Sequence, residues 1–154
     1  MGQTTDWRRV VRQALVAGFI AGVLIDAYLL ATQVLPSHGS AVQMWQWVAS
    51  AALGQVAFSS PSYALLGLIA HFCVSIGWAG GYAYLAQQQP FVNQRWAISG
   101  LVYGIVVYIF MDILLLGVRM FTPPSPVMLL NALIAHCVFF GLPLAYVVAR
   151  MDRT

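Results

Sequence analysis

Two aspartates and two histidines lie inside strongly apolar stretches of this chain, one of each type in either half. The acids are Asp26 in GVLIDAYLL and Asp112 in YIFMDILLL, and the histidines are His71 in LIAHF and His136 in LIAHC. An ionisable side chain inside a lipid bilayer costs at least ~2.5 kcal/mol, so such residues are rare there and usually functional. These four residues are therefore the candidate site residues.

Four chemistries are open to this set. The first is a divalent metal site, because two imidazoles and two carboxylates can complete a tetrahedral zinc shell or part of an iron or manganese shell. In that interpretation Asp26, His71, Asp112 and His136 are the ligands, at a fixed site or on a transit path. The second is b-type haem with His71 and His136 as axial ligands in a four-helix bundle.

The third chemistry is proton or cation handling without a bound metal, since chains of Asp and His form proton relays in transporters. The fourth is structural: each Asp hydrogen-bonds a His across a helix pair, a contact worth ~0.6 kcal/mol on average in membranes. Four such residues at one depth favour a metal site over the others. A soluble-type enzyme is disfavoured, because the chain has no P-loop, no GxSxG and no Gly-rich dinucleotide turn.

The composition indicates an integral membrane protein. The 154 residues are 61% hydrophobic and 7% charged, whereas a soluble domain carries about 25% charged residues. Four stretches approach or exceed the ~20 apolar residues that a membrane helix needs, at about 11–35, 62–86, 97–118 and 127–149. Between the first two, VQMWQWVASAALGQVAF predicts a short helix on the outer membrane surface, because Trp prefers the interface.

The two halves of the chain resemble each other, which predicts two parallel helical hairpins at about 8–86 and 95–150 in a single all-α domain over 1–154. Ser60-Pro61 and Ser125-Pro126 precede the matching spans, with Ser as the expected N-cap and Pro as the first helical residue. Each His lies ten residues after its Pro, about 15 Å into the membrane at 1.5 Å per residue. Each Asp lies seventeen residues after an Arg, which places all four side chains at nearly one level, where we expect them to converge.

Small residues at four-residue spacing predict close contacts between the helices. The pairs are Gly18/Gly22, Gly77/Gly81, Gly100/Gly104 and the weaker Gly141/Ala145. Asp26 continues the series of the first pair and Asp112 that of the third, so both acids should face protein.

Arginines predict the orientation. Six lie at one side of the expected spans and one at the other: Arg8, Arg9, Arg12, Arg95, Arg150 and Arg153 against Arg119. This bias predicts that both termini lie in the cytoplasm. Arg119 could reach inward and hold Asp112 ionised. The expected partners are the lipid bilayer and either a second copy or a larger membrane complex, and no nucleic acid, because the basic residues flank the spans.

From the second span onward the chain resembles the YagU-like family of small bacterial inner-membrane proteins. The matching residues are His71-x3-Ser75-x5-Gly81-Tyr82, Trp96 with Gly100 and Gly104, Thr122-Pro123-Pro124, and His136. The resemblance implies a four-span inner-membrane protein with an outer segment after the first span. Asp26 and Asp112 are not part of that pattern.

Overall fold

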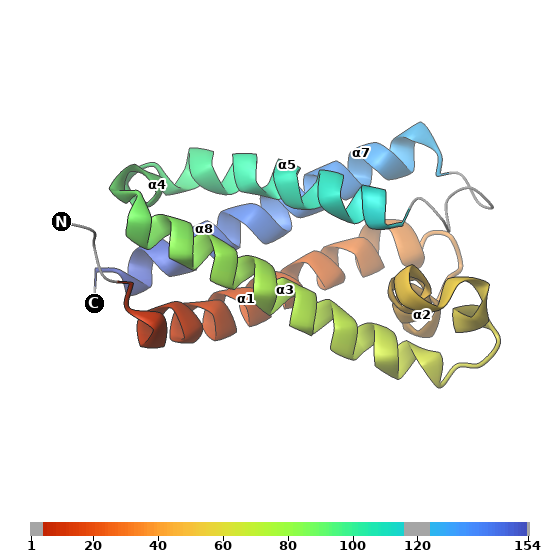
Figure 1. Ribbon diagram of the computed structural model, residues 1–154. Coiled ribbons are helices and arrows are strands. Elements are labelled where there is room, and N and C mark those ends of the chain that lie inside the picture. The colour runs from red at the N-terminus through yellow and green to blue at the C-terminus, as the bar shows by residue number, and fades with distance from the viewer. Residues whose placement is uncertain (1–4, 116–123, 154) are drawn as a thin grey trace.

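The computed structural model describes residues 5–115 and 124–153, and within them all regular structure is helical (Figure 1). The first span is α1 (Trp7–Leu29), which continues as the π-helical η1 (Leu30–Val34). A short helix α2 (Ala41–Leu53) and a 3-10 turn η2 (Gly54–Phe58) follow. Next come α3 (Tyr63–Gln88), α4 (Pro90–Gln94) and α5 (Trp96–Leu114). The last span comprises α7 (Pro126–Ile134), the π-helical η3 (Ala135–Gly141) and α8 (Leu142–Met151).

Four of these helical stretches are long and apolar enough to cross a membrane, which indicates a multi-pass membrane protein. They are Trp7–Val34, Tyr63–Gln88, Trp96–Leu114 and Pro126–Met151. The last of them is called the fourth span below. Each begins or ends within about four residues of the bounds expected from the sequence, except that the expected end of the third span, at residue 118, lies outside the described residues.

The four long helices form a bundle in which α1 and the fourth span are both central. Helix α1 packs along α3 on one side and along η3 and α8 on another, while α5 packs on η3 and α8. Helix α1 begins and α8 ends at the same end of the bundle, here called the termini end (Figure 1). Helix α2 crosses the other end, here called the loop end, where it packs on α3.

Small side chains recur in the bundle interior, and many large apolar side chains lie outside. Ala17, Ala21, Ala79 and Ala83 are fully buried, whereas large apolar residues such as Phe19 are more than half exposed. This is the distribution expected in lipid, where no hydrophobic force drives helices together and small residues let backbones approach.

Glycines lie where α1 crosses α3 and where α5 crosses the fourth span. A Cβ built on Gly18 of α1 would lie 2.6 Å from the Ile76 Cα of α3, and one on Gly104 of α5 would lie 2.7 Å from the Cys137 Cα of η3. Both distances are far below contact, so no side chain fits there. Gly77, in contrast, faces open space, so the helix contact predicted for it is wrong.

The two Ser-Pro signals behave differently. Ser125 is the N-cap of α7, accepts a hydrogen bond from the Met128 N–H, and precedes Pro126 as first residue, as predicted. Ser60 is not a cap: α3 begins at Tyr63. The reason is that Ser60 and Pro61 form a turn whose carbonyls accept from residues three further on, and the Ser60 carbonyl also accepts from the Gln46 side chain of α2.

Candidate functional site

Asp26 and His71 form an ion-pair contact between the first two spans. The Nε2 atom of His71 lies 3.1 Å from Oδ2 of Asp26, and the side chains are only 16% and 15% exposed. Gly22, one turn before Asp26, makes this approach possible: a Cβ there would lie 3.1 Å from the Phe72 ring and 3.3 Å from the Ser75 hydroxyl. The face that carries Gly18, Gly22 and Asp26 therefore meets another helix, as the spacing predicts, and that helix is α3.

The neighbours of His71 fix which ring nitrogen carries the proton. Nε2 also lies 3.3 Å from the carbonyl oxygen of Gly22 and 3.4 Å from the hydroxyl of buried Ser75. A carboxylate and a carbonyl are both acceptors, so a proton on Nε2 satisfies them. The pair therefore has the geometry in which a carboxylate orients an imidazole.

Aromatic side chains shield the pair. The Trp45 ring, from α2, lies at a steep angle to the His71 ring with centroids 5.5 Å apart, and the centroid of the Phe72 ring lies 5.2 Å from that of His71. Trp45 reaches this place because α2 rests on Gly67 of α3, where a Cβ would collide with the Trp45 carbonyl. Electrostatic interactions are stronger in such a low-dielectric setting than in water.

The second half carries the matching histidine in a different setting. His136 lies in the π-helical η3, where its Nδ1 donates to the Ala132 carbonyl at 2.8 Å, and its ring lies 5.7 Å from that of Tyr108. Tyr108 stands where the predicted repeat has Gly22 in the first half, so the second half has a large side chain at a position where the first has none. Asp112 is half-buried on α5.

The expected convergence of Asp26, His71, Asp112 and His136 is not found. Within residues 5–115 and 124–153, no three His, Cys, Asp or Glu side chains lie close enough to hold a metal ion. The reason lies in the helix order: α3 packs on α1 and α2, whereas η3 packs on α5 and α1. The Asp26–His71 pair alone offers fewer donors than the three or four that zinc sites use. Metal and haem binding thus stay predictions.

A polar cluster at the termini end escaped the sequence analysis. The Asp152 carboxylate contacts Arg9 at 2.6 Å, accepts from fully buried Gln13 at 2.6 Å, and accepts from Asn93. This cluster joins the start of α1, the short helix α4 and the end of α8. From the sequence, Arg9 indicates only the orientation. The sequence signal for this cluster is Gln13, a polar residue inside an apolar span.

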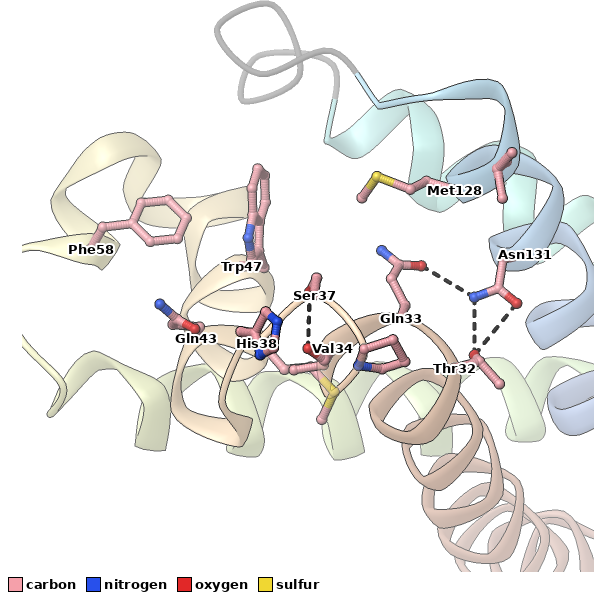
Figure 2. A pocket seen from close by; sticks show the side chains of 14 residues that line it. Thr32, Gln33, Val34, Ser37, His38, Gln43, Trp47, Phe58, Met128 and Asn131 are labelled. Carbon is pink, nitrogen blue, oxygen red and sulfur yellow. Dashed lines mark hydrogen bonds between the residues drawn. The ribbon is translucent and has the colours of Figure 1, made fainter.

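A second polar cluster lies at the loop end, beside a cavity of about 750 Å³ (Figure 2). Asn131 of α7 accepts from the Tyr28 hydroxyl at 2.7 Å and donates to Thr32 at 3.0 Å and to Gln33 at 3.4 Å. His38 lies exposed on the same cavity wall. The expected contact between Arg119 and Asp112 cannot be placed, because Arg119 lies outside the described residues.

No family model, curated protein or solved structure matches this chain. The resemblance to the YagU-like family therefore stays a prediction.

Proposed function

We propose that this chain is a proton-handling membrane protein whose working group is the Asp26–His71 pair. One observation carries the proposal: an imidazole and a carboxylate in contact at 3.1 Å, both largely buried between two membrane-length helices. Imidazole changes its charge between pH 5 and 8, which makes it the usual group for proton transfer near neutrality. The carboxylate beside it supplies the compensating charge.

The surroundings of the pair support proton transfer over a structural contact. A structural hydrogen bond needs no second histidine, yet His136 occupies the matching place in the other half of the sequence. The glycine crossings are also matched, since Gly18 meets α3 and Gly104 meets the fourth span. These similarities support a parallel repeat of two hairpins.

We also propose the orientation that the arginines predict, with the termini end of the bundle in the cytoplasm of a bacterial cell.

Proton flux into liposomes tests the proposal. We expect purified wild-type protein to acidify the interior, reported by an enclosed pH-sensitive dye, when a potassium gradient and valinomycin set the voltage. His71→Gln removes the titrating group and should reduce the flux to that of protein-free liposomes. His38→Gln is the matched control, because His38 is exposed at the loop end, and it should keep the wild-type flux. Equal flux from both variants would contradict the proposal.

The same purified protein also tests whether the chain binds a metal ion or haem. Our account expects neither a stoichiometric metal nor a Soret band, because the Asp26–His71 pair gives only two donors. About one zinc, iron or manganese per chain, lost in a His71→Ala/His136→Ala variant, would restore the four-ligand interpretation. A Soret band lost in that variant would instead indicate bis-His haem.

A further inference from the structure

An apolar groove opens beside the Asp26–His71 pair. It has a volume of about 500 Å³ and lies where α2 and α3 meet the end of α5, with walls that include Trp47, Ala52, Ala70 and Met111. Cavities of 300–1,000 Å³ hold ligands of ordinary small-molecule size. His71 is the one ionisable side chain in its wall among the residues that the structure describes.

From this geometry we infer that the groove binds a lipid-soluble phenol or quinol, with its hydroxyl on His71 and its apolar tail along α2 and α5. The inference deepens the proposed function and rests on it for the fate of the proton. Binding itself depends only on the groove and on the His71 ring.

The state of the imidazole selects a hydroxyl as the head group. We assign the ring proton to Nε2, because this atom lies within reach of both the Asp26 carboxylate and the Gly22 carbonyl. In the neutral ring the other nitrogen, Nδ1, is then a lone-pair acceptor, which an O–H can satisfy and an ether or a bare carbonyl cannot. A ligand without a donor would leave this nitrogen without a hydrogen bond in an apolar groove, at a cost of about 1–3 kcal/mol.

The walls and the proton chemistry select a phenol over an aliphatic alcohol. Trp47 offers an aromatic surface, and Met111 a thioether sulfur, and both pack favourably on an aromatic ring. A phenolic O–H is also far more acidic than an aliphatic one. In the transfer step the ligand O–H bond breaks and an N–H bond forms at Nδ1, leaving a phenolate. Asp26 then neutralises the imidazolium.

The test is a binding titration of protein in nanodiscs, under exclusion of oxygen, with decyl hydroquinone and with its dimethyl ether. Intrinsic tryptophan fluorescence gives the dissociation constant. We expect the hydroquinone to bind and the ether, which has no O–H, to bind about tenfold more weakly, the loss of one hydrogen bond. His71→Ala should abolish this difference between the two ligands.

A second variant tests the groove itself and leaves Asp26 and His71 unchanged. Ala70 is exposed in the groove wall, so Ala70→Phe fills the groove without disturbing the bundle and should weaken both ligands. His38→Ala should bind as the wild type does. Equal binding of the two ligands, binding unchanged by Ala70→Phe, or no binding at all would overturn the inference. Loss of binding with His71-dependent flux intact would overturn this inference alone, whereas binding without any flux would overturn only the proposed function.

Discussion

Replacing Gly104 by Leu should destroy the packing of α5 on the fourth span. A Cβ at this position would already collide with the backbone carbonyl of His136 and lie 2.7 Å from the Cys137 Cα. These backbone atoms of the fourth span cannot rotate away as a side chain can, so the two helices must separate. Overpacking of a close contact typically costs 1–3 kcal/mol, and more where the backbone is the obstacle. We expect Gly104→Leu to lower the free energy of unfolding by at least about 3 kcal/mol.

The measurement is unfolding in detergent micelles, followed by helical circular dichroism and tryptophan emission. Gly77→Leu is the matched control: it makes the same change in a membrane-length helix, but its Cβ meets nothing within 4 Å. Leu is a better helix former than Gly by about 0.8 kcal/mol, so the control should be neutral or slightly stabilising. Similar losses for both variants would show that the α5 crossing is not where the structure places it.

Asp152→Ala should destabilise the termini end of the bundle. The carboxylate accepts hydrogen bonds from Gln13 and Asn93 and contacts Arg9. Its removal leaves the buried Gln13 amide only the Val148 carbonyl, 3.4 Å away, and takes an acceptor from the half-buried Asn93 amide. A buried polar group that is left poorly satisfied costs about 1–3 kcal/mol. Because Arg9 is 36% exposed, its share is small. We expect a loss of roughly 2–4 kcal/mol in the free energy of unfolding.

Asp152→Asn separates charge from hydrogen bonding in this cluster. An amide oxygen can still accept from Gln13, so this variant should lose clearly less stability than Asp152→Ala. Hydrogen exchange should also show faster opening of the α1 start and the α8 end in the alanine variant. If Asp152→Ala unfolds at the same denaturant concentration as the wild type, the cluster is only a surface contact.

The spans and one face of α1 follow from the sequence, because their signals are long or periodic. Four apolar runs of bilayer length need no tertiary information. The series Gly18, Gly22, Asp26 fixes one helical face, and that face does meet α3. His71, the partner of Asp26, is also a candidate from the sequence, because it is an ionisable residue inside an apolar span.

The arrangement of the four candidate residues could not be read in this way. The prediction of equal depth assumes a uniform helical rise, whereas the fourth span contains seven π-helical residues around His136, just before Pro143. Pro143 lacks an N–H and cannot make the regular bond to residue 139, which accounts for the break. Which helices are neighbours is also not encoded in any periodicity, and that order separates His71 from His136. Likewise, no pattern links Asp152 to Gln13, 139 residues apart.

The most direct test of the central claim is a double-mutant cycle on proton flux with Asp26→Asn, His71→Gln and both together. Residues that act as one unit are strongly non-additive, so the double variant should lose no more than either single variant. Asp6→Asn is the matched control, because Asn also caps the start of α1, and it should leave the flux unchanged. Independent, multiplying losses from Asp26→Asn and His71→Gln, or wild-type flux in either one, would contradict the account.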